Sequence, residues 1–251
     1  MNKLFDSNLV LNEEEHKYTL KTKPNLEFTS VTTLIHKFFQ PFDAEKTAVY
    51  LVSNVQQYKD KTAEELLADW KQSGRDGNEV HKQLETYLNN QSQPKHPKAR
   101  QGVKWLEDNE YGNGDFKFYS EVTLYSEEIK IAGTIDLLIY NTATDEYALG
   151  DWKTSKVIRK SGYKNAMGTG PAKELEDCNY IHYSLQLSMY RYILKEYYDL
   201  EVKNQKLIHL KDNTTNSYPT PYYEEIIKEM TQKGWLAKEN TQLELAFNNG
   251  K

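Results

Sequence analysis

The chain has 251 residues, of which 27% are charged and 38% are hydrophobic, and its formal net charge at pH 7 is −5. This composition is typical of a folded globular protein and excludes an intrinsically disordered chain. No apolar run approaches the roughly 18 residues that a membrane span needs, so we expect no membrane partner. The first residues resemble neither a signal peptide nor a transit peptide, which favours a cytoplasmic location.

Cys178 is the only cysteine of the chain. A single cysteine excludes a disulfide framework, a cysteine zinc site and a four-cysteine iron–sulfur cluster. We therefore expect a reducing compartment and no iron–sulfur cofactor.

In chain order, the first half is predicted to contain a short hairpin and then several helices. The hairpin is expected over 16–20 and 26–30, and the helices over 31–39, 44–58, 62–72, 77–88 and 98–109. Thr29 or Ser30 is expected to cap the first of these helices, and Asp43 the second.

The second half is predicted to begin with three consecutive strands. These strands are expected over 116–125, 129–140 and 146–153. A loop with glycines and a proline follows over 154–177, and then a strong helix over 179–197. A short strand over 205–210 and a closing helix or two over 222–246 complete the chain. This order predicts an α/β (α+β) fold with a mixed sheet flanked by helices and an N-terminal helical lobe. We expect one domain over 1–251, with the lobe at about 1–110, the core at about 114–210 and a C-terminal helical segment at about 220–251.

Two of the predicted strands carry an aspartate where a core strand would have an apolar residue. A four-residue loop over 142–145 would pair Asn141 with Glu146, and counting back from that pair sets Asp136 opposite Asp151. Lys153 then shares their face, with Thr134 across from it. Opposed like charges are destabilising unless they are neutralised, and a divalent cation such as Mg²⁺ neutralises a carboxylate pair. The alternative is an exposed hairpin face with two unrelated aspartates, but the neighbouring residues are too apolar for one.

The segments Gly133-Thr-Ile-Asp136 and Gly150-Asp151-Trp-Lys153-Thr-Ser resemble the core of the PD-(D/E)xK nuclease superfamily, in its RecB-like exonuclease branch. Ile135 stands where the name of the superfamily puts proline. Within the branch, the chain is similar to the mitochondrial genome maintenance exonucleases and their phage-encoded relatives, which share an early segment seen here as Ser30-Val-Thr-Thr-Leu-Ile35. The resemblance spans residues from about 30 to about 195 and implies a restriction-endonuclease-like core.

Three further segments resemble the same branch and imply additional site residues. Gly77-Asn-Glu-Val-His81-Lys-Gln-Leu-Glu85 matches a helix whose histidine is a metal ligand, and Glu85 would orient that ligand or be an ordinary surface glutamate. Glu121 matches an acidic residue at the edge of the site. Gln186-Leu-Ser-Met-Tyr190 matches a helix that faces it.

The implied centre holds one or two Mg²⁺ or Mn²⁺ ions, with His81, Asp136, Asp151 and the backbone carbonyl of Trp152 as ligands. Lys153 would position or deprotonate the attacking water and offset charge in the transition state. Glu121, Gln186 and Tyr190 complete the expected catalytic set.

The segment from Lys153 to Lys164, both included, contains five basic residues and no acidic residue. Because this basic loop leaves directly from Lys153, we expect it to bind DNA phosphates rather than to be merely a solvated loop. The expected DNA-binding residues are Thr154, Ser155, Lys156, Arg159 and Lys160.

The resemblance implies a metal-dependent deoxyribonuclease, an exonuclease acting on single-stranded ends, in replication, recombination or repair alongside other proteins of those processes. A phage-encoded enzyme would act in the cytoplasm of the bacterial host. Two alternatives stay open: a structure-specific endonuclease with the same residues, and a non-catalytic DNA-binding relative. The sequence assigns no role to the residues after Tyr222.

Overall fold

The structure is a computed structural model that describes residues 4, 8–12, 17–232 and 235. The strands are β1 (Leu9–Asn12), β2 (Lys17–Leu20), β3 (Lys23–Ser30), β4 (Phe116–Ser126), β5 (Ile131–Asn141), β6 (Glu146–Lys153), β7 (Val202–Leu210) and β8 (Thr215–Pro219). The helices are α1 (Val31–His36), α2 (Ala44–Asn54), α3 (Ala63–Asn90), α4 (Pro97–Asp108), α5 (Asn179–Tyr198) and α6 (Glu224–Met230), and the short 3₁₀ turns are Gln56–Tyr58, Tyr163–Asn165 and Gly170–Ala172.

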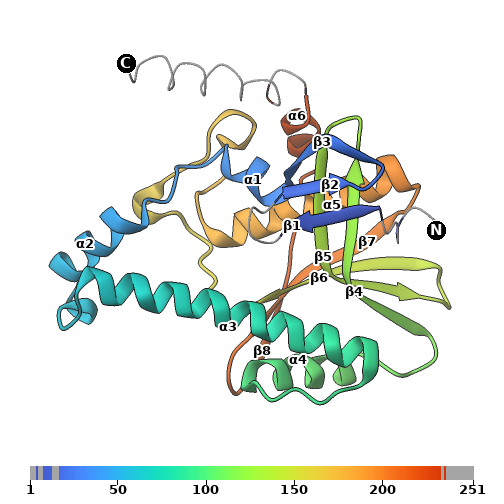
Figure 1. Cartoon of the computed structure of the whole chain (residues 1–251), viewed down its shortest axis with the longest axis horizontal. Helices are drawn as coiled ribbons and strands as arrows, with labels where there is room; N and C mark the ends of the chain where they lie inside the picture. The colour runs from blue at the N-terminus through green and yellow to red at the C-terminus, as the bar shows by residue number, and fades with distance from the viewer. Residues whose placement is uncertain (1–3, 5–7, 13–16, 233–234, 236–251) are drawn as a thin grey trace.

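The eight described strands form one mixed sheet, as the sequence predicts (Figure 1). β5 is its centre: β4 pairs with one edge of β5 along its full length, antiparallel. The other edge is shared, because β6 pairs with residues 137–141 and β3 pairs, in parallel, with Ile131 and Ala132. β7 continues the sheet in parallel beside β6, and β8 follows it as an antiparallel edge strand. The stretch of β5 between Ala132 and Leu137 therefore pairs with neither β3 nor β6.

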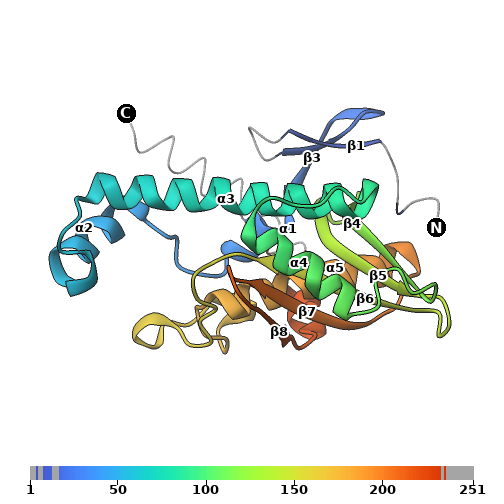
Figure 2. The ribbon, with the colours of Figure 1, turned by 90° about the horizontal axis from the view of Figure 1, so that it is seen from below.

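Helices cover both faces of this sheet (Figure 2). α1, α5 and α6 pack on one face around a large apolar core that includes Leu138, Leu149 and Leu185. α3 and α4 pack on the other face through a second core, with Leu84, Trp105 and Trp152 among its members. A third, smaller core joins the N-terminal hairpin to β4 and β5. The α+β fold class is thereby confirmed. No helix among the described residues is long and apolar enough to cross a membrane.

The predicted helix starts agree with the structure. The Ser30 hydroxyl accepts a hydrogen bond from the backbone N–H of Thr33 at the start of α1, and the Asp43 carboxylate accepts one from Lys46 at the start of α2. Thr62 and Glu65 form a complete capping box at the start of α3.

The predicted break between two helices near residue 75 is wrong, because α3 runs unbroken from Ala63 to Asn90. An interior glycine costs only about 1 kcal/mol relative to alanine, so Gly74 and Gly77 weaken the helix without ending it. Gly77 also has a packing role: a Cβ atom there would lie 3.0 Å from Oγ1 of Thr154, so the glycine lets the loop after β6 approach α3.

Two predicted elements at the C-terminal end differ from the structure or lie partly outside the described residues. The strand expected over 205–210 begins earlier, at Val202, and β8 was not predicted. The closing helix is α6, Glu224–Met230; of the predicted span after it, only 231, 232 and 235 fall within the described residues.

The predicted hairpin register is confirmed over its paired half. Asn141 pairs with Glu146 and Leu137 with Gly150, as the four-residue loop requires. The ladder ends there, so the predicted pairs of Asp136 with Asp151 and of Thr134 with Lys153 do not form. Instead, the Asp136 carboxylate accepts a hydrogen bond of 2.9 Å from the backbone N–H of Trp152, and Thr134 pairs with Thr123 of β4.

Candidate metal centre

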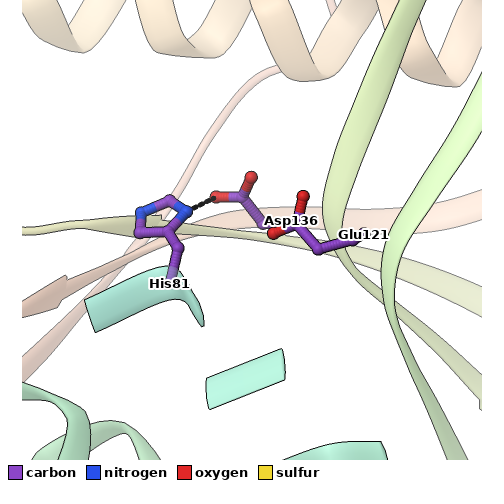
Figure 3. Close-up of side chains that lie close together, drawn as sticks. All are labelled: His81, Glu121 and Asp136. Carbon is purple, nitrogen blue, oxygen red and sulfur yellow. Dashed lines mark ion pairs between the residues drawn. The ribbon is translucent and has the colours of Figure 1, made fainter. Parts of the chain in front are cut away.

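Three side chains from three elements converge where β6 leaves β5 (Figure 3). His81 comes from α3, Glu121 from β4 and Asp136 from β5. One ligand atom of each lies within 4.8 Å of those of the other two, and all three side chains are partly buried. Two carboxylate oxygens and an imidazole nitrogen at this spacing are a donor set that fits a divalent cation.

The His81 ring is held by the backbone of β6. Its Nε2 lies 3.1 Å from the carbonyl oxygen of Trp152, where an Nε2–H group donates to that oxygen. This tautomer leaves the Nδ1 lone pair facing Asp136, with Nδ1 and Oδ2 3.6 Å apart. An outer hydrogen bond of this type is how metal-binding histidines are usually oriented. In this arrangement the Trp152 carbonyl positions His81. The expected role of that carbonyl as a metal ligand stays a prediction.

Glu121 has a left-handed backbone conformation in the middle of β4, with φ = 49°. A non-glycine residue in this region costs of order 1–3 kcal/mol, and inside a strand, away from a turn or a helix end, such strain is a feature that clusters at functional sites. The regular register between β4 and β5 places Glu121 opposite Asp136, yet this position is the one missing from their ladder. The strain therefore falls directly on the candidate centre.

The alternation of side chains between the two faces changes at this point in both strands. Ile135 and Leu137 are two residues apart, which places them on one face of a regular strand, but they pack in different cores. In β4, Tyr119 and Val122 are three residues apart and contact the same core. Glu121 and Asp136 thus lie at a shared kink, where the carboxylates face an opening rather than either packed layer.

Asp151 lies beside this group and is paired with the predicted catalytic lysine. Its carboxylate is 1% exposed and its Oδ2 lies 2.6 Å from Nζ of Lys153. The Lys153 ammonium also stands over the ring of Tyr183 of α5, 4.4 Å from the ring centroid, which is a cation–π contact. Lys153 is therefore fixed from two sides.

Crowded carboxylates shift the protonation equilibria of the centre. Burial, and then the neighbouring charges of Asp136 and Glu85, raise the pKa of Glu121 to about 8. Burial raises the pKa of Asp151 to about 7, although Lys153 opposes that shift. Burial alone would lower the pKa of Lys153, but Asp151 and Asp136 outweigh it and raise that pKa. A bound cation would relieve this repulsion.

Gln186 and Tyr190, on one face of α5, lie against the unpaired stretch of β5. The Gln186 amide donates a hydrogen bond of 3.1 Å to the Tyr190 hydroxyl. A Cβ atom at Gly133 would lie 2.6 Å from Cε1 of Tyr190, so this glycine makes room for the tyrosine ring. Burial raises the pKa of Tyr190 well above its ordinary value, which keeps the hydroxyl protonated.

An open pocket with a volume of about 770 Å³ extends from the centre along α3. His81 and Glu121 line it, and so does Glu85, whose carboxylate forms an ion pair of 2.8 Å with Lys82. Thr123 and Thr134, a cross-strand pair, line it from the sheet. The volume falls within the roughly 300–1,000 Å³ of typical ligand pockets.

None of the five predicted DNA-binding residues lines this pocket. The carbonyl oxygens of Thr154 and Ser155 accept hydrogen bonds from Lys98 Nζ and His209 Nε2, so these two residues anchor the start of the loop. Lys156, Arg159 and Lys160 are exposed, and the Lys160 ammonium stands 5.1 Å from the centroid of the Tyr180 ring.

Tyr183 and Tyr18 contact residues of the site, and neither contact is among the sequence-based predictions. Tyr183 precedes Gln186 and Tyr190 at helical i, i+3, i+7 spacing, so the pattern of one helix face would have indicated it. Tyr18 donates or accepts a hydrogen bond of 3.0 Å with Thr134 across 116 residues of chain, and no local pattern indicates that contact.

Comparisons with known proteins identify no relative by sequence. No family model matches the chain, and no curated protein matches it. Among solved structures, the chain is similar to one described as "Crystal structure of SSO0001", with a TM-score of 0.37 and 16% sequence identity over 86% of this chain and 75% of that chain. A similarity this low indicates neither a family nor an activity.

Proposed function

We propose that this protein is a divalent-metal-dependent deoxyribonuclease that removes nucleotides from single-stranded DNA ends during replication, recombination or repair. The observation that carries the proposal is the convergence of His81, Glu121 and Asp136 within 4.8 Å, next to the buried ion pair of Asp151 and Lys153. The resemblance of the sequence motifs to RecB-like PD-(D/E)xK exonucleases supports the same reading, because the matching residues gather at one place in the fold.

The donor chemistry of the centre favours Mg²⁺ or Mn²⁺. Carboxylate oxygens suit Mg²⁺ and Mn²⁺, and an imidazole nitrogen adds affinity for Mn²⁺. His81, Glu121 and Asp136 would hold the ion, with Asp151 as a further carboxylate at its side. A divalent ion bound there supplies a water of lowered pKa and neutralises the phosphate.

The protein groups around the centre have separate tasks in this proposal. Lys153 carries a fixed positive charge, because its pKa is raised, and it offsets the negative charge that develops on the phosphate oxygens. Asp151 holds that ammonium at 2.6 Å, and Tyr183 restricts it from the other side. Trp152 fixes the His81 tautomer through its carbonyl oxygen.

Digestion of end-labelled single-stranded DNA with Mg²⁺ or Mn²⁺, by the wild type and by Asp151→Asn, tests the proposal. We expect metal-dependent cleavage by the wild type that the variant lacks. Asp145→Asn, in the turn of the same hairpin, is the matched control and should keep full activity. A wild type that folds but leaves the DNA intact with either metal contradicts the proposal.

Circular single-stranded DNA separates the exonuclease from the structure-specific endonuclease, which would use the same residues. An exonuclease needs an end and leaves the circle uncut, whereas an endonuclease linearises it. Binding of the circle without cleavage of any substrate would instead indicate a non-catalytic DNA-binding relative.

A further inference from the structure

The outer wall of the pocket is one face of α3. Arg75, Asn78 and Lys82 follow one another at spacings of three and four residues, so their side chains lie in a row along that face. All three are exposed and line the pocket that leads to the candidate metal centre. We call these three residues the α3 row.

Arg75 and Asn78 of the α3 row offer donors to a ligand, whereas Lys82 already has a carboxylate partner. The Arg75 guanidinium donates to the side-chain oxygen of Gln72, with Nε at 3.1 Å, and among the described residues it forms no ion pair. The side chain of Asn78 forms no hydrogen bond within the described part of the chain. Lys82 is paired with Glu85 but its side chain is 68% exposed. A guanidinium and an amide without carboxylate partners are suited to phosphate oxygens.

The position of the α3 row indicates which phosphate it would contact. An α-helix rises about 1.5 Å per residue, so Arg75 lies roughly 9 Å along the axis from His81. A strand whose scissile phosphate is held at His81, Glu121 and Asp136 would bring a neighbouring phosphate within reach of the Arg75 side chain. A ligand that fills both positions carries more than one phosphate in a chain, as a nucleic acid strand does.

Acidic and basic side chains are both present along the pocket. Glu85 and Glu121 line it near the centre, with Asp136 beside Glu121, and on the wall formed by α3 the acidic Glu79 lies between the basic Arg75 and Lys82. Without a cation the acidic side chains repel phosphate, and Arg75 and Lys82 are then the attractive groups of the pocket.

We infer that Arg75, Asn78 and Lys82 bind the sugar–phosphate backbone of the DNA strand next to the scissile phosphate and set its position over the metal centre. The inference rests on the proposed function and deepens it, because it places the strand along α3 rather than only along the loop after Lys153. Backbone contacts carry no base preference, so the affinity they supply is independent of sequence and sensitive to salt.

Fluorescence anisotropy with an end-labelled oligodeoxythymidylate tests the α3 row, with Ca²⁺ in place of Mg²⁺ so that binding is measured without turnover. For Arg75→Gln we expect a Kd roughly tenfold higher, at the scale of one lost charge-assisted contact. The slope of log K against log salt concentration should fall in magnitude by about 0.7 for each phosphate contact that is lost. Arg75→Lys keeps the charge and should retain most of the slope.

Lys203→Gln is the matched control, because it removes one exposed, glutamate-paired cation on β7, outside the pocket. It should leave both Kd and salt slope unchanged. If the wild type binds the oligonucleotide and Arg75→Gln and Lys82→Gln bind it equally well with an unchanged slope, the α3 row is refuted and the nuclease proposal stands. If the wild type binds no oligonucleotide under these conditions, both fail together.

Discussion

The two halves of the β5–β6 hairpin are made from the same two strands and have opposite characters. In the paired half, Leu138 faces Leu149 across a regular ladder, and both side chains are fully buried. In the opened half, the ladder has ended, and Asp136, Asp151 and Lys153 take the places that apolar residues hold further along. One half is explained by packing and the other by charge.

The difference shows where this fold gains and loses stability. Apolar pairs in the first half stabilise the sheet, since burial of a leucine side chain contributes about 1.5–3 kcal/mol. The second half gathers carboxylates whose pKa values burial raises to about 8 for Glu121 and about 7 for Asp151. Such a cost is typical of functional sites, where activity and stability compete.

Removing a charge from the opened half should have the largest effect, which is a loss of activity without a loss of stability. For Asp136→Asn we expect a loss of metal-dependent cleavage of roughly 10³-fold, at the scale of losing a central electrostatic contact. The free energy of unfolding without metal should stay equal or rise, because one of the repelling carboxylates is neutral. Digestion assays and urea unfolding in EDTA measure the two quantities. Strong destabilisation with retained activity per folded molecule would show that Asp136 is a structural residue.

Truncating a side chain in the paired half should instead lower the stability of the fold. Leu149→Ala removes a fully buried leucine and should lower the free energy of unfolding by about 2–5 kcal/mol. Leu67→Ala, at a half-buried position of α3, is the control and should cost clearly less. Urea denaturation followed by tryptophan fluorescence measures both. Equal losses for the two variants would mean that the hairpin core is not the tightly packed region that the structure describes.

The contact between Gly133 and Tyr190 connects the opened half with α5. Gly133→Ala places a Cβ atom 2.6 Å from the Tyr190 ring, so we expect a loss of about 1–3 kcal/mol in stability from overpacking. The double variant Gly133→Ala/Tyr190→Leu should recover part of that loss, because the smaller side chain makes room. A thermal unfolding series provides the comparison. Simple additivity of the two substitutions would be inconsistent with a direct clash.

Much of this arrangement could be predicted from the sequence, for identifiable physical reasons. The caps Ser30 and Asp43 are local hydrogen bonds, and the register from Asn141 to Leu137 follows from loop length alone. Both depend on residues close together in the chain. For the same reason the sequence predicted that Asp151 and Lys153 belong together.

What could not be predicted depends on contacts between distant segments. Strand periodicity assumes unbroken alternation, and the left-handed conformation of Glu121 breaks it opposite Asp136. The two helices expected over 62–72 and 77–88 are one helix, α3, in which the approach of Thr154 accounts for Gly77. β8 is a short, polar edge strand that only its pairing with β7 defines.

The stability of the metal-free protein should depend on pH through the opened half. The folded pKa of Glu121 is about 8 and its ordinary value is 4.5, so between these pH values the folded state binds a proton that the unfolded chain has released. The free energy of unfolding therefore falls as pH rises from 5 to 8. At about 1.4 kcal/mol per pKa unit, a few kcal/mol is the upper bound, and exposure to solvent reduces it.

Urea unfolding in EDTA at several pH values measures this slope. Glu121→Gln should make it shallower and leave the part that comes from Asp151, whose pKa is also raised, whereas Glu128→Gln, on the exposed turn after β4, should leave it unchanged. Mn²⁺ should offset the loss more strongly at pH 8 than at pH 5.5, because its binding needs deprotonated carboxylates. An identical slope in Glu121→Gln would mean that this carboxyl group is not shifted.

The smallest expected effect concerns the ring that restrains Lys153. Tyr183→Leu removes the cation–π contact at 4.4 Å, which is worth about 0.5–2 kcal/mol, and should lower kcat several-fold with little change in KM. Tyr183→Phe keeps the ring face and should retain most of the rate. If the phenylalanine variant is as slow as the leucine variant, the hydroxyl group matters and the cation–π account is wrong.

The central claim is that the opened half of the hairpin binds a divalent cation. Anomalous diffraction from crystals soaked in Mn²⁺ tests it most directly, because the signal locates the ion without reference to activity. The account predicts a peak between the His81 ring and the carboxylates of Glu121 and Asp136, and the loss of that peak in Asp136→Asn. Well-diffracting crystals with Mn²⁺ elsewhere, or with no peak at these three side chains, would contradict it.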